Sequence, residues 1–169
     1  MPHRLIWDKF KRFLVYRVLS LDDTPHRIAL GVAIGMFVAW TPTIPFQMAL
    51  TVALSALLGA NKFVGLPFVW ISNPLTILPI YGPNYLIGCW LLPGEQKWSK
   101  FTEAMAGAMN FGQGFWSTLH SWWSATMAIF LPLWLGSIIM GLLVGCLSYV
   151  LIYWGVIRFR RIFHHFHDG

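Results

Sequence analysis

The side chains that could carry chemistry in this chain are polar but uncharged, and they gather at two places. Residues 28–93 form an apolar run in which Lys62 is the only formally charged side chain. Proline-containing interruptions break this run at residues 41–45 and 72–76. Hydroxyl and amide groups donate and accept hydrogen bonds, so they can hold a polar ligand without reacting with it. The candidate ligand-binding residues at the two interruptions are Thr41, Thr43, Gln47, Ser72, Asn73 and Thr76.

A catalytic set is not visible in the sequence. The apolar segments contain no Asp or Glu, and Ser72 and Ser137 have no evident base or orienting carboxylate. No phosphate-binding glycine loop is present. Three histidines lie close together near the C-terminus with Asp168 beside them, but on a tail they make a weak metal site: His164, His165 and His167. We therefore expect a protein that is not an enzyme, with no cofactor and no metal.

The composition indicates a membrane protein. The chain is 57% hydrophobic and only 11% charged, whereas about a quarter of the residues of a soluble domain are charged. Nucleic-acid binding is therefore an improbable explanation of the net charge of +6. Basic residues flank the apolar region at both ends, which predicts cytoplasmic termini. We expect an all-α, polytopic protein of the bacterial inner membrane, with residues 21–161 as its membrane domain.

The helices on either side of each interruption are short. Residues 28–40 would span about 20 Å as a helix, less than the ~30 Å of a bilayer core. Proline ends or kinks a helix, so Pro42 and Pro45 predict that residues 28–60 form a broken hairpin, either re-entrant or barely spanning. Asn73 and Pro74 likewise predict a broken span over residues 63–92. Asn61 is the expected cap at the end of the hairpin.

The remaining segments predict one span and two interfacial regions. Residues 1–20 have the pattern of a basic amphipathic helix lying in the headgroup layer. Residues 95–124 carry an aromatic stripe typical of an interfacial segment. Residues 125–157 lie within the longest charge-free stretch and predict one long C-terminal transmembrane helix. Residues 162–169 form a histidine-containing tail.

Small residues at four-residue spacing predict close helix packing. Gly31 and Gly35 lie on the first short helix, and Gly141 and Gly145 lie on the C-terminal one. The second ridge either docks on the Gly31–Gly35 helix or mediates self-association. Cys89 and Cys146 both lie in apolar segments and predict free thiols.

Several motifs resemble a known family. They are residues 24–31, 35–37, 41–45 and 73–76, together with Asn61. This pattern is similar to domain of unknown function 2062, a family of small bacterial integral membrane proteins, and the resemblance covers about residues 21–161. It implies a bacterial membrane protein of a few helices and supplies no catalytic residues. Related domains joined to glycosyltransferase-like domains connect the resemblance with lipid or envelope chemistry.

Two hypotheses for function follow. Interrupted helices at membrane depth must be buried or line a wet cavity, and transporters use them to bind substrates. The leading hypothesis is a polar pocket between the two breaks, with Arg17 and Arg27 at its cytoplasmic mouth. It would bind or translocate an anionic amphiphile such as a phospholipid or lipid-linked phosphate. The polar groups would otherwise only cap one another's helix ends.

The alternative is a non-catalytic assembly or scaffold subunit. Its glycine ridges would join an envelope enzyme or a second copy of the chain. The expected partners are therefore membrane lipids, with a homo-oligomer or an envelope enzyme as further options.

Overall fold

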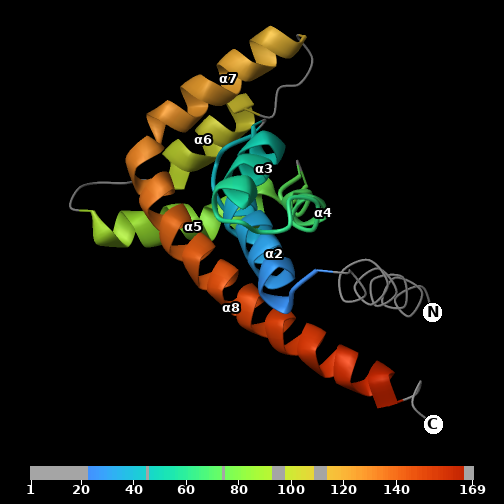
Figure 1. The fold of residues 1–169 in the computed structure, drawn as a ribbon. Helices are drawn as coiled ribbons and strands as arrows, with labels where there is room; N and C mark the ends of the chain where they lie inside the picture. Colours follow the sequence, from blue (N-terminus) through green and yellow to red (C-terminus); the bar gives the residue numbers. More distant parts are fainter. Residues whose placement is uncertain (1–22, 45, 74, 93–97, 109–113, 166–169) are drawn as a thin grey trace, which may run out of the picture.

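The computed structural model describes residues 23–44, 46–73, 75–92, 98–108 and 114–165. Every regular element in these ranges is an α-helix, so the predicted all-α fold is confirmed there (Figure 1). The predicted interfacial helix over residues 1–20, including Arg17, lies outside the described ranges. The helices are α2 (Pro25–Ala39), α3 (Gln47–Leu57), α4 (Leu66–Val69), α5 (Ile77–Leu91), α6 (Trp98–Ala108), α7 (Phe115–Ala128) and α8 (Phe130–His165).

Helix α8 is the long apolar element of the fold. Within it, the segment Phe130–Arg161 has 32 residues and a mean hydropathy of 2.3 over its most apolar window, long and apolar enough to cross a membrane. The predicted C-terminal helix is therefore confirmed, although it begins at Phe130 and the preceding residues belong to α7. Pro132 falls in the first turn, where its missing N–H removes no helical hydrogen bond.

Helices α2 and α3 form the predicted pair on either side of residues 41–45. The side chain of Thr24 accepts a hydrogen bond from the backbone N–H of Arg27 at 3.3 Å, and Pro25 takes the first helical position. Pro25 has no N–H that needs a partner, and Thr24 provides one for the N–H of Arg27. Helix α2 ends at Ala39, and α3 begins at Gln47.

The end of α3 differs from the prediction. Gly59, with φ of +67°, ends the helix, because a left-handed residue at this position suits glycine best. The side chain of Asn61 instead accepts hydrogen bonds from the N–H groups of Phe63 and Val64, at 3.1 and 3.3 Å. Asn61 therefore caps the turn that follows α3.

The second predicted break is confirmed at Asn73. Its side-chain oxygen accepts from the N–H groups of Leu75 and Thr76, at 3.0 and 3.2 Å. The part before the break is less helical than predicted, because α4 is a single turn. The part after it is the 15-residue helix α5, which contains Pro83.

Glycines bring the backbone of residues 61–65 onto α2. A Cβ atom at Gly31 would lie 2.5 Å from the carbonyl oxygen of Asn61, and one at Gly35 would overlap the backbone of Gly65. Only glycine allows so close an approach. Chain returning from α3 therefore covers the glycine face of α2.

The second small-residue ridge also docks on α2, but on another face. A Cβ at Gly141 would lie 3.1 Å from the carbonyl oxygen of Phe37, and one at Gly145 would lie 3.2 Å from that of Ala33. The predicted docking of α8 on this helix is thus observed, without contact between the two glycine pairs. Figure 1 shows α2 running beside α8.

Helices α5, α6 and α7 gather around the first part of α8 (Figure 1). Glycines again permit contact: side chains at Gly136 and Gly88 would overlap the backbone of Asn84 and Pro132, respectively. Phe101 of α6 is fully buried and stacks on Tyr85 of α5, with ring centroids 5.2 Å apart. Cys89 and Cys146 are both free.

Candidate functional site

The two interruptions meet in a buried set of neutral side chains. The hydroxyl of Tyr81 donates to the carbonyl oxygen of Thr41 at 2.9 Å. The amide nitrogen of Gln47 lies 3.3 Å from the Tyr81 hydroxyl and 3.5 Å from the same carbonyl. Ser72, from the second interruption, donates to the side-chain oxygen of Gln47 at 2.9 Å. All four residues are buried.

The same set reaches α8 through Asn84. Its amide nitrogen donates to the carbonyl oxygen of Trp40 at 2.9 Å and lies 3.0 Å from the hydroxyl oxygen of Ser137. Thr41 donates from its own hydroxyl to the carbonyl of Val38 at 2.8 Å. The last carbonyls of a helix lack intrahelical hydrogen-bond donors, and these side chains donate to them. We call Thr41, Thr43, Gln47, Ser72, Tyr81, Asn84 and Ser137 the break cluster.

The structure brings together four of the eight predicted ligand-binding residues: Thr41, Thr43, Gln47 and Ser72. Asn73 and Thr76 bond to each other and to the turn between α4 and α5, and no bond to the break cluster is observed for them. Arg27 lies near the start of α2, about 20 Å from Thr41 by helical rise. It is therefore not at the mouth of a pocket between the breaks.

The break cluster is suited to holding helix ends in place. Its members are neutral, and all but the half-buried Thr43 are buried. Its observed bonds join its members to one another or to backbone carbonyls, and buried polar groups are stable when they are paired in this way. Only Oδ1 of Asn84 is buried without a hydrogen-bond partner among the cluster's side-chain atoms. Sequence reasoning missed the part played by Tyr81, Asn84 and Ser137. The three-residue spacing of Tyr81 and Asn84, which places both on one face of α5, was the available signal.

The opposite end of α2 carries a charged set of residues. Arg27 forms an ion pair with Asp23 at 3.3 Å and donates from Nε to the carbonyl oxygen of Gly59 at 2.9 Å. Asn61 donates to the other carboxylate oxygen of Asp23 at 3.1 Å. Arg160 of α8 donates to the backbone carbonyl of Asp23. These bonds tie the start of α2, the end of α3 and the end of α8 together.

We call this region the basic end, because cations outnumber carboxylates there. Asp23 is its carboxylate within the described ranges. His26 lies beside it, with Nδ1 2.8 Å from the hydroxyl oxygen of Tyr149 on α8. The two bonds of Arg27 use only some of the five donors of a guanidinium group. The cationic residues of the basic end are Arg27, Lys62, Arg158, Arg160 and Arg161.

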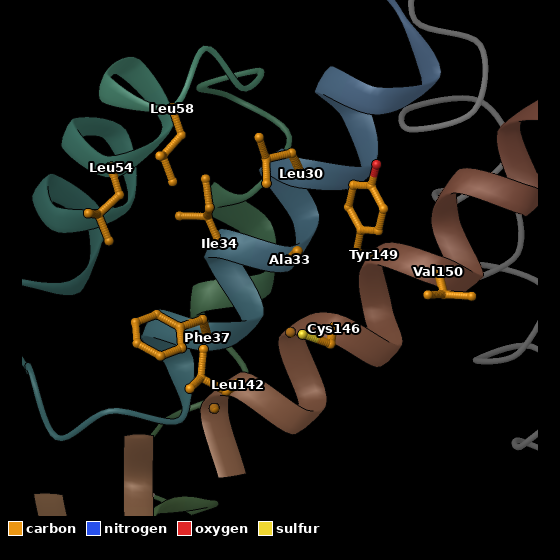
Figure 2. A pocket seen from close by; sticks show the side chains of 12 residues that line it. Leu30, Ala33, Ile34, Phe37, Leu54, Leu58, Leu142, Cys146, Tyr149 and Val150 are labelled. Atoms are coloured by element: carbon orange, nitrogen blue, oxygen red, sulfur yellow. The ribbon is translucent and has the colours of Figure 1, made fainter. Parts of the chain in front are cut away.

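An apolar groove starts next to the basic end. It has a volume of about 520 Å³ and lies between α2, α3 and α8, which is within the range of about 300–1,000 Å³ for ligand pockets. Figure 2 shows Leu30, Ile34 and Phe37 of α2 between the side chains of α3 and those of α8. The lining residues are Leu30, Ala33, Ile34, Phe37, Leu54, Leu58, Gly141, Leu142, Gly145, Cys146, Tyr149 and Val150.

The two ends of the groove differ. At one end, Tyr149 lines the groove and reaches His26 with its hydroxyl. At the other end, the ring of Phe37 lies against Gly141, where a Cβ would be 3.0 Å from it. Figure 2 shows Leu30 and Tyr149 toward the first end and Phe37 and Leu142 toward the second. The groove therefore leads from a mouth next to the basic end to an apolar end where the Phe37 ring packs on Gly141, which we call the closed end.

The groove was not predicted from the sequence. The spacing of Leu30, Ile34 and Phe37 marks one face of a helix. However, nothing local indicates that Cys146 and Val150, more than a hundred residues later, form the opposite wall.

Comparisons with known proteins give one match. A family model described as "Uncharacterized protein conserved in bacteria (DUF2062)" matches residues 8–164. No curated protein and no solved structure matches the chain.

Proposed function

We propose a lipid-binding function for this chain, which belongs to the DUF2062 family of uncharacterised bacterial proteins. It is a multi-pass inner-membrane protein that binds an anionic amphiphile, either a phospholipid or a lipid-linked phosphate. The acyl or prenyl chain lies in the groove, and the headgroup lies at the basic end. The juxtaposition of this apolar groove with the cationic mouth carries the proposal.

The aromatic residues of α8 support its placement in a bilayer. Trp134 and Trp154 are twenty residues apart, or about 30 Å along a helix, which matches the thickness of the hydrocarbon core. Tryptophan prefers the membrane interface, and the exposed Trp154 is followed one turn later by Arg158, whereas the indole nitrogen of Trp134 is buried in the protein. Between the two tryptophans, large apolar side chains such as Leu143, Leu147 and Leu151 are exposed on the surface of α8.

The hairpin of α2 and α3 fits a re-entrant arrangement. Its two ends meet at the basic end, where the N–H of Asn61 donates to the carbonyl of Arg27 at 3.0 Å. Its tip lies beside Ser137, one turn from Trp134. Chain that enters and leaves on one side places Lys62 with the other cations. By the positive-inside rule this side is cytoplasmic, together with the end of α8.

The energetics assign recognition to the headgroup. A lipid chain gains little by moving from the bilayer into an apolar groove, because lipid tails are as apolar as leucine. By contrast, each basic residue near an anionic headgroup contributes about 1 kcal/mol. Arg27 and His26 are the nearest candidates at the mouth. We therefore expect retention to depend more on headgroup charge than on chain length.

The break cluster has a supporting role in this proposal. Its neutral side chains pair the carbonyls at the end of α2, and this holds the hairpin in shape. The glycines through which the scaffold alternative would join its partners, Gly141 and Gly145, are buried against α2. A binding role is therefore the better supported of the two hypotheses.

The test compares lipid retention by two tryptophan variants of α8. Cys146 lines the groove, whereas its neighbour Leu147 is 60% exposed and does not. Cys146→Trp should fill the groove and lower retention of phosphatidylglycerol, measured by native mass spectrometry of the full chain. Leu147→Trp, the matched control, should retain as much as the wild type. Equal retention by both variants and the wild type would contradict a site in the groove.

A second comparison tests the headgroup. The wild type should retain phosphatidylglycerol more strongly than phosphatidylcholine with the same acyl chains. Equal retention of the two lipids would exclude recognition by the basic end.

A further inference from the structure

We infer that the groove takes its ligand from one leaflet only, the leaflet at the basic end, and that the protein does not carry the headgroup across the bilayer. This inference rests on the proposed function and names the side from which the lipid enters. It also decides between binding and translocation. The observations that carry it are the length of the groove, its closed end and the absence of charge in the break cluster.

The groove is as long as one leaflet is deep. On α8 its lining residues run from Gly141 to Val150, a rise of about 14 Å at 1.5 Å per residue. Half of the hydrocarbon core is about 15 Å. A chain entering beside Tyr149 would therefore end near the middle of the bilayer and would not reach the opposite headgroups.

The end away from the cations is closed by packed backbone. Phe37 covers Gly141, and one turn further along α8, Gly136 lies directly against the backbone of Asn84. Gly88 makes the same kind of contact with Pro132. A headgroup would have to separate α8 from both α2 and α5 to pass this point. The glycine contacts that close the fold also block the path.

The break cluster, which lies beyond the closed end, contains no cationic side chain to receive an anion. Its side chains are neutral, and those of Thr41, Tyr81 and Asn84 donate to backbone carbonyls. An ionised group inside a bilayer is costly unless it is paired or hydrated. An anionic headgroup is thus favoured at the mouth and disfavoured everywhere further along the groove.

The experiment places phosphatidylglycerol in only one leaflet of vesicles that contain the full-length protein. Occupancy is measured as protection of Cys146 from a lipid-soluble maleimide. A Lys62→Cys variant, labelled with an impermeant maleimide, gives the fraction of molecules whose basic end faces outward. With the lipid in the outer leaflet, the protected fraction should equal this outward fraction. With the lipid in the inner leaflet, the protected fraction should equal the fraction of molecules whose basic end faces inward.

Transbilayer movement is measured in the same vesicles with fluorescent phosphatidylglycerol and an impermeant quencher. Its rate should equal that of protein-free vesicles. Protection from either leaflet regardless of orientation, or an accelerated movement, would overturn the inference while leaving lipid binding intact. Absence of protection from both leaflets would instead refute the proposed function, and the inference with it.

Discussion

The two ends of α2 are held by different kinds of hydrogen-bond partners. At its start, Asp23, Arg27 and Asn61 form a partly exposed network that includes an ion pair. At its end, Tyr81 and Asn84 donate neutral hydrogen bonds to carbonyls in the core. Charges are inexpensive near water but costly in an apolar interior. The comparison teaches that one end can meet a charged ligand, whereas the other can only hold the fold together.

The largest expected effect comes from breaking the buried end. Asn84→Leu keeps a side chain of similar size but removes the donor to Trp40 and Ser137. Hydrogen bonds between membrane helices average about 0.6 kcal/mol and reach about 1.7. We expect the free energy of unfolding to fall by about 2 kcal/mol, measured by denaturant titration in micelles. An unchanged free energy would show that the cluster does not hold the hairpin.

A milder change at the same end sharpens this prediction. Tyr81→Phe deletes only the hydroxyl, and Gln47 remains 3.5 Å from the carbonyl of Thr41. We expect a loss of about 1 kcal/mol in the free energy of unfolding, by the same titration. Thr76→Val, in the turn outside the cluster, provides a comparison at the second break. A larger loss of unfolding free energy for Tyr81→Phe than for Asn84→Leu would contradict the expected order of the two effects.

Substitutions at the basic end should lower ligand binding. Arg27→Gln removes a cation from the mouth, and we expect retention of phosphatidylglycerol to fall about fivefold, equivalent to about 1 kcal/mol. Native mass spectrometry at two salt concentrations measures this, because screening should shrink the difference. Arg161→Gln removes the same charge without touching the bonds of Arg27. Equal losses in the two variants would indicate a general charge effect and no specific contact.

The smallest effect is expected at the closed end of the groove. Phe37→Ala should lengthen the groove without altering its mouth. Preference between phosphatidylglycerols of different chain length should then shift slightly toward the longer chains, measured by competition in native mass spectrometry. A change in headgroup preference would contradict the separation between chain and headgroup sites.

Local chemistry made much of the fold predictable. The two breaks are predicted by Pro42, Pro45 and Asn73, because proline and the residue before it disfavour helix. Thr24 and Pro25 announce the start of α2 for similar reasons. The long apolar part of α8 follows from the absence of charged residues before Arg158. These features depend only on residues that are close together in the sequence.

The candidate site was less predictable, because it depends on which helices pack together. The polar residues at the breaks suggested a pocket; in the structure they bond to one another, and Tyr81 of α5 donates to the carbonyl of Thr41. The groove needs Leu54 of α3 and Cys146 of α8 to face the same side of α2. No periodicity within one helix contains that information. Arg27, which we predicted at the mouth of that pocket, lies instead at the basic end, where it pairs with Asp23.

One paired measurement tests this division of roles most directly. Arg27→Gln and Asn84→Leu are each assayed for unfolding free energy and for retention of phosphatidylglycerol in the same micelles. The account predicts a crossover: the first variant loses retention with little loss of stability, and the second loses stability while its folded fraction retains the lipid. Loss of retention by folded Asn84→Leu, together with full retention by Arg27→Gln, would contradict the account and return the ligand to the break cluster.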